Sequence, residues 1–115
     1  MEEESSYVVD ITPEGEAYYY DLLKYLYSTH SEESADRKSD EILNMALSLD
    51  RMPNRGRDED KLAFLGVGHK YLLYEVTSRK TIKIIYFIVE SEKMVYVTDF
   101  FPTEMDDSRI EERNQ

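Results

Sequence analysis

The sequence contains no cysteine. This absence excludes a disulfide framework, a thiolate metal site and a cysteine nucleophile, so the fold must depend on noncovalent packing. The two histidines, His30 and His69, lack the His-x-x-x-His spacing of a helical metal site. We therefore expect no metal and no other cofactor, and we expect both histidines at the surface or in turns.

A long apolar run is also missing. The longest run, Ile84 to Val89, is far shorter than the roughly 20 residues that a membrane-spanning helix needs. The first six residues include three glutamates, whereas a secretory signal begins with basic and then apolar residues. These features predict a soluble, cytoplasmic protein that has no membrane partner.

Positive charge is scarce except in one stretch. The net charge is −11, and residues 103–115 carry five acidic residues against Arg109 and Arg113. Residues 51–83, by contrast, hold eight basic residues against four acidic ones. The overall charge argues against general nucleic-acid binding, but a local basic patch is expected. The acidic C-terminal segment could cover that patch as a built-in phosphate mimic, which is a hypothesis of autoinhibition.

The first half of the chain predicts a strand followed by two helices. Tyr7 to Ile11 is β-branched and aromatic, and Thr12 and Pro13 after it are typical of a helix start. Apolar residues then recur at helical spacing from Glu14 to about Thr29 and again from about Glu33 to Asp50. The short connection predicts an antiparallel helical hairpin.

The second half predicts strands. Three β-forming runs, Tyr71–Val76, Ile82–Val89 and Met94–Phe101, are joined by short polar connections, which indicates an antiparallel meander. Leu62 to Gly68 is apolar enough to be buried, but its two glycines favour a packed connection over a strand.

Together these elements predict an α+β fold of two layers, in which the helical hairpin covers one face of a mainly antiparallel sheet. We expect a single domain over residues 7–102, an acidic N-terminal tail over residues 1–6 and an acidic C-terminal tail over residues 103–115. The C-terminal tail has too little apolar content to fold alone.

Two short motifs in this element order resemble the RelE/ParE toxin superfamily, whose members include plasmid stabilisation proteins. The first is Ser48–Arg57, where a leucine, a proline and a Gly-Arg pair close the second helix. The second is Ile82–Val89, where Lys83 stands three positions before Tyr86. The similarity covers about residues 7–101.

This resemblance implies a bacterial toxin of a type II toxin–antitoxin module that blocks growth. RelE-like members cleave messenger RNA at the ribosome, whereas ParE-like members poison DNA gyrase. Both are neutralised by a cognate antitoxin protein, whose C-terminal segment wraps the toxin.

If the chain is a ribosome-dependent, metal-independent endoribonuclease, the resemblance implies that Lys83, Tyr86 and Lys61 are its catalytic residues. RNA cleavage needs a base for the ribose 2′-hydroxyl, cations for the phosphate charge and an acid for the leaving oxygen. Contacts to the nucleic acid or another target are then assigned to five further basic residues of the stretch: Arg55, Arg57, Lys70, Arg79 and Lys80.

Several observations leave this chemistry open. Where catalytic members carry basic residues and a tyrosine after the final strand, this chain has the acidic run Asp99–Asp107. Lys83 and Tyr86 are an odd number of positions apart, so they face opposite sides of an ideal strand, and Tyr86 could belong to the core. Arg55 and Arg57 could pair with nearby acidic residues instead of substrate.

The first helix is unusually rich in tyrosine, and not all of these rings can face one core. Tyr18, Tyr19 and Tyr27 are assigned to a protein-binding surface, because exposed tyrosine is enriched at interfaces. The partner could be the antitoxin, the target or a second copy in a homodimer. The alternative to a toxin is a non-catalytic binding protein that retains the toxin fold and uses this hairpin or a sheet edge.

Overall fold

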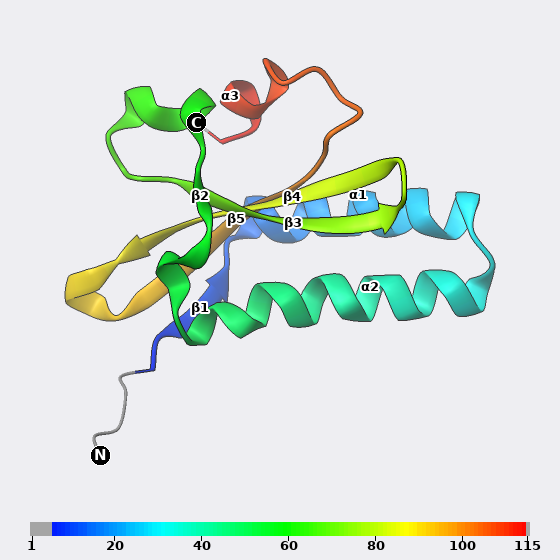
Figure 1. The fold of residues 1–115 in the computed structure, drawn as a ribbon, viewed down its shortest axis with the longest axis horizontal. Coiled ribbons are helices and arrows are strands. Elements are labelled where there is room, and N and C mark those ends of the chain that lie inside the picture. The colour runs from blue at the N-terminus through cyan, green and yellow to red at the C-terminus, as the bar shows by residue number, and fades with distance from the viewer. Residues whose placement is uncertain (1–5, 115) are drawn as a thin grey trace.

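The computed structural model describes residues 6–114. The chain begins with strand β1 (Val8–Ile11), which passes directly into α1 (Pro13–Thr29). Thr12 caps this helix, since its hydroxyl accepts a hydrogen bond from the Gly15 amide at 3.0 Å. After a two-residue connection, α2 (Glu32–Leu47) runs back beside α1, so the predicted hairpin is present (Figure 1). The predicted N-terminal tail lies almost wholly outside the described residues.

Four further strands complete one sheet: β2 (Arg57–Asp58), β3 (Lys70–Thr77), β4 (Lys80–Val89) and β5 (Met94–Pro102). Their spatial order is β1-β5-β4-β3-β2. β3, β4 and β5 form the predicted antiparallel meander, and β1 pairs with β5 in parallel. The α+β class is thereby confirmed, with a mixed sheet of five strands. Sequence patterning missed β2, because two residues are too few to show a period.

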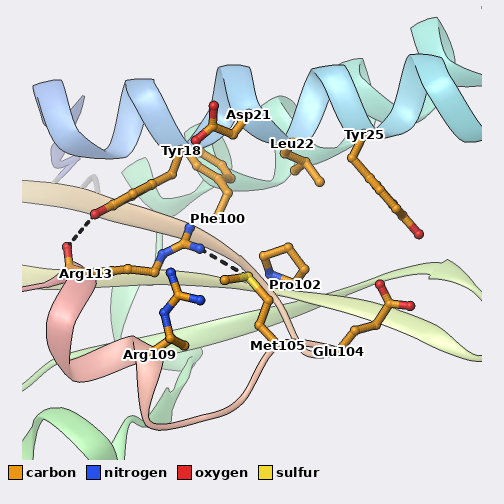
Figure 2. A pocket seen from close by; sticks show the side chains of 10 residues that line it. All are labelled: Tyr18, Asp21, Leu22, Tyr25, Phe100, Pro102, Glu104, Met105, Arg109 and Arg113. Atoms are coloured by element: carbon orange, nitrogen blue, oxygen red, sulfur yellow. Dashed lines mark hydrogen bonds between the residues drawn. The ribbon is translucent and has the colours of Figure 1, made fainter.

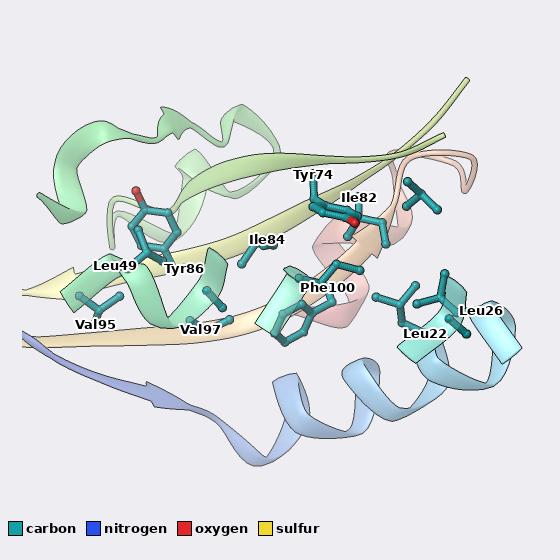
Figure 3. Close-up of a cluster of buried hydrophobic side chains, with 14 residues drawn as sticks. Leu22, Leu26, Leu49, Tyr74, Ile82, Ile84, Tyr86, Val95, Val97 and Phe100 are labelled. Atoms are coloured by element: carbon teal, nitrogen blue, oxygen red, sulfur yellow. The ribbon is translucent and has the colours of Figure 1, made fainter. Parts of the chain in front are cut away.

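The main core lies between the sheet and the helical hairpin. Alternate residues of β4, Ile82, Ile84 and Tyr86, point to this side, and all three are buried. Leu22 and Leu26 of α1 meet them from the helical layer (Figure 3). Burial of these apolar surfaces, at about 25 cal/mol per Å², is the main favourable term holding the two layers together.

The opposite face of the sheet is covered too, although the two-layer prediction left it open. Leu62 of the 3-10 helix η3 (Asp60–Leu65) and Ile110 of the short helix α3 (Arg109–Arg113) pack against Ile85 and Phe101. In Figure 1 both elements lie on the side away from α1 and α2. The acidic C-terminal segment is thus folded onto the sheet over residues 103–114, where Ile110 supplies its apolar anchor.

Three more 3-10 turns complete the described chain: η1 (Ser48–Asp50), η2 (Pro53–Arg55) and η4 (Glu90–Glu92). Across residues 6–114, no helix is both long enough and apolar enough to span a bilayer.

Candidate functional site

The two motifs behind the family resemblance are in direct contact. The Tyr86 hydroxyl, on β4, donates a hydrogen bond to the Pro53 carbonyl at 2.5 Å and accepts one from the Gly56 amide at 3.1 Å. Burial raises the pKa of Tyr86, so the hydroxyl keeps its proton and remains a donor. A Cβ at position 56 would overlap this hydroxyl, which explains the glycine. Tyr86 therefore anchors the loop that follows α2.

Lys83 lies on the other face of the sheet, and its charge is already paired. Its Nζ is 2.8 Å from Oε1 of Glu59, with the lysine side chain 16% exposed and the glutamate 3% exposed. The ammonium group also lies 4.3 Å from the centre of the Tyr71 ring, in a cation–π contact. A buried carboxylate of opposite charge thus occupies the position that a substrate phosphate would need.

The three predicted catalytic residues are not brought together. Lys83 and Tyr86 face opposite sides of the sheet, as their spacing on β4 predicts. Lys61 is exposed on η3, and its backbone amide donates to Oε2 of the same Glu59 at 3.1 Å. Lys61 and Lys83 are therefore neighbours through Glu59, a residue that the sequence did not single out as functional.

The remaining basic residues are spread along the sheet edge and its turns. Arg55 donates to the Arg51 carbonyl at 2.9 Å, which caps the end of the helical hairpin, while Arg57 is exposed on β2. Lys70 pairs with Asp58 at 3.0 Å. Arg55 and Lys70 therefore make structural contacts, and Arg57 faces solvent.

Arg79 and Lys80 lie at the β3–β4 turn, with Arg79 exposed. Nζ of Lys80 is 3.0 Å from Oε2 of Glu104 and donates to the Tyr25 hydroxyl at 2.9 Å. These contacts join the turn to α1 and to the C-terminal segment.

Four of the five tyrosines of α1 divide into two groups. Tyr18 and Tyr19 are half-buried and donate to the carbonyls of Arg113 and Ser39 at 3.0 and 3.1 Å. Tyr20 and Tyr27 are exposed, and the Tyr27 hydroxyl donates to Asp36 on α2. Of the three assigned interface residues, Tyr27 is the one that presents an exposed ring.

A cavity of about 490 Å³ separates α1 from the C-terminal segment. Figure 2 shows Tyr18, Leu22 and Tyr25 along its helical side and Met105 and Arg109 on the opposite side. Its walls combine apolar and aromatic groups with charged groups at the rim, the composition typical of binding pockets. The cavity is therefore a candidate binding site.

Asp99 organises the C-terminal side of this region, a structural role that the sequence did not predict. Its carboxylate is fully buried and accepts hydrogen bonds from Arg113 at 2.6 and 3.1 Å and from Asn114 at 2.9 Å. The Arg113 guanidinium also lies 4.0 Å from the centre of the Tyr18 ring. Burial raises the pKa of Asp99, although Arg113 opposes the shift. The acidic residue of the last strand thus holds the C-terminal helix in place.

Within the described residues, no group of three or more histidine, cysteine, aspartate or glutamate side chains is placed to hold a metal ion. Comparisons with known proteins assign no family. No family model matches the chain, and no curated protein matches it significantly. The candidate sites are thus argued from their geometry.

Proposed function

We propose that this chain is the toxin component of a type II toxin–antitoxin module with a RelE/ParE-like fold. The observation that carries the proposal is the contact between the two motifs of the resemblance, Tyr86 on Pro53 and Gly56. Through this contact, the tyrosine of one motif holds the proline and glycine of the other in place. A helical hairpin on an antiparallel meander supports the same proposal.

We further propose that the toxin acts by binding a protein, as ParE-like members do with DNA gyrase, and not by cleaving RNA. Lys83 is paired with Glu59, and Tyr86 is buried on the opposite face of the sheet. On the face that carries Lys83, α3 covers part of the sheet surface. In-line cleavage of a phosphodiester requires cations and proton-transfer groups that converge on one open site. The arrangement around Lys83 does not offer one.

In this proposal the cognate antitoxin binds the cavity between α1 and the C-terminal segment. Its apolar wall includes Leu22, Phe100 and Met105, which suits an apolar side chain of a partner segment. The exposed Tyr20 and Tyr27 lie on the other side of α1 from this cavity, so they form a separate surface on the helix. A second copy of the chain is the other occupant that the cavity could accept.

Controlled expression in a bacterial host tests the proposal, with pulse-labelling of protein and DNA synthesis in separate samples. We expect growth arrest in which DNA synthesis falls before translation. Lys83→Ala should retain this effect wherever it accumulates as soluble protein. Lys93→Ala, at an exposed turn, is the matched control for removing one lysine.

Two other outcomes would redirect the proposal. A rapid loss of translation that Lys83→Ala abolishes and Lys93→Ala keeps would establish ribosome-dependent RNA cleavage instead. Normal growth with abundant soluble protein would leave the second candidate, a non-toxic binding protein of the same fold. The cavity beside α1 and the exposed tyrosines support this second candidate, because both are surfaces that a protein partner can bind.

A further inference from the structure

A second cavity, of about 380 Å³, lies at the connection between β2 and β3. It is lined by Asp58 to Asp60, Ala63, Gly66, Gly68 and His69. None of these residues lines the cavity beside α1. Three consecutive acidic residues and a histidine therefore meet at one small cavity.

His69 is the unusual member of this set. It was expected at the surface or in a turn, yet it is only 6% exposed, and its ring lies edge-on to Phe87 with 5.1 Å between ring centres. Its Nδ1 atom is buried and has no hydrogen-bond partner. Every other buried side-chain nitrogen or oxygen within residues 6–114 has one. A buried polar atom without a partner is unfavourable, so the position of this nitrogen at a cavity needs a physical explanation.

Because the His69 ring is neutral, one of its two nitrogens can accept a hydrogen bond. Burial lowers the pKa of His69, although the nearby Glu59 opposes the shift, so the ring is neutral at neutral pH. In the tautomer protonated at Nε2, the Nδ1 atom accepts a hydrogen bond. Nδ1 is closed off from solvent, so an N–H donor of a ligand reaches it only when the ring or the adjoining loop shifts.

The acidic residues at this cavity select for positive charge. Glu59 is paired with Lys83, and Asp58 is paired with Lys70. The exposed Asp60 carboxylate takes part in no hydrogen bond or ion pair among the described residues. Its unmatched charge would repel an anionic ligand and attract a cation.

The rim of this second cavity is open and partly apolar, as the binding of a polypeptide segment requires. Gly66 and Gly68 have φ values of 69° and 91°, and a Cβ at either position would meet nothing within 4 Å, so the approach is open. Phe64 and Val67, from the same segment, are exposed apolar side chains. A free small cation would leave them in water, whereas a protein partner would cover them.

We propose that this cavity binds an arginine side chain of a partner polypeptide. The planar guanidinium carries five N–H donors, so it can donate to the exposed Asp60 carboxylate, and once the His69 ring shifts a second N–H can reach Nδ1. The neighbouring Phe64 and Val67 would contact apolar residues beside that arginine. This inference does not depend on the proposed toxin function.

Titration of the full chain with the peptide acetyl-Gly-Arg-Gly-amide, followed by NMR of the imidazole nitrogens, tests the proposal. We expect millimolar peptide to shift the His69 signals while the His30 signals stay in place. The same peptide with citrulline for arginine has nearly the same shape without the charge, and it should bind far more weakly. Asp60→Asn should weaken arginine-peptide binding about tenfold, the effect of losing one charged hydrogen bond.

Asp40→Asn is the matched control, because Asp40 is an exposed aspartate on α2. It should leave binding unchanged. Equal binding of the citrulline peptide, or equal losses in the two variants, would overturn the proposal. Unmoved His69 signals at millimolar peptide would also overturn it and would mean that the cavity holds water only.

Discussion

Arg113 lies against the fully buried carboxylate of Asp99, with 2.6 Å between Nη2 of the arginine and Oδ1 of the aspartate. This pair joins the C-terminal helix α3 to strand β5. A buried carboxylate that loses its cation keeps its desolvation penalty, so removing one partner costs far more than the pair contributes relative to an apolar core. The pair therefore decides whether the acidic C-terminal segment stays on the sheet.

Arg113→Leu should lower the free energy of unfolding by about 3 kcal/mol, because it leaves Asp99 buried and unpaired. Urea denaturation at neutral pH measures the change. Arg109→Leu is the control, since its ion pair with Glu112 is half exposed and contributes less than about 1 kcal/mol. Adding Asp99→Val to Arg113→Leu should restore much of the loss. Equal stability of the two single variants would show that the pair does not hold α3.

Lys83→Met should destabilise the protein by about 2 kcal/mol, because Glu59 would keep only the backbone amide of Lys61 as a hydrogen-bond partner. The double variant with Glu59→Gln should lose less than the sum of the two single variants, which reveals the coupling. Lys70→Met removes a lysine from an exposed partner, Asp58, and should have a much smaller effect. Additive losses in thermal unfolding would contradict the pairing.

Tyr86→Phe should lower the free energy of unfolding by about 2 kcal/mol, since the Pro53 carbonyl and the Gly56 amide both lose their partner. Hydrogen exchange at the Gly56 amide should accelerate more than exchange in α1. Tyr7→Phe removes an exposed tyrosine hydrogen bond, to Glu90, and serves as the control. Unchanged exchange at Gly56 would mean that this loop is held by other contacts.

His69 should make stability depend on pH below its unfolded pKa of 6.5. Its pKa is lowered by burial in the folded state, so the unfolded chain binds the proton first as the pH falls. Stability is then lost as the pH decreases through this window, with a slope of at most about 1.4 kcal/mol per pH unit. Urea denaturation between about pH 7.5 and 5.5 should show a shallower decline for His69→Gln than for the wild type. Parallel curves would exclude His69 as the source.

Much of the fold could be predicted because its signals are local. Helical spacing, the Thr12-Pro13 start and the short polar turns of the meander predicted each major helix and strand to within a few residues. Sequence patterning missed β2, which exists only because Arg57 and Asp58 lie beside Tyr71 and Lys70 of β3. It also treated residues 103–115 as a tail, because two apolar residues, Met105 and Ile110, give no period to detect.

The candidate site was less predictable than the fold. Alternation along β4 correctly placed Lys83 and Tyr86 on opposite faces, since side-chain direction in a strand depends only on position. The basic composition of residues 51–83 suggested a patch, but it carried no information on which acidic residue would neutralise each cation. Only the folded chain pairs Lys83 with Glu59, 24 residues away.

The sequence by itself determined the α+β class, the order of the main elements and the absence of thiol chemistry, because spacing and composition act within a few neighbouring residues. The tertiary structure alone decided that Arg113 neutralises Asp99, that Tyr86 holds the Gly56 loop and that His69 is buried without a partner for Nδ1. Each of these depends on sheet register and on packing between distant segments. Long-range contacts of this kind form only when the whole core closes, so no local pattern encodes them.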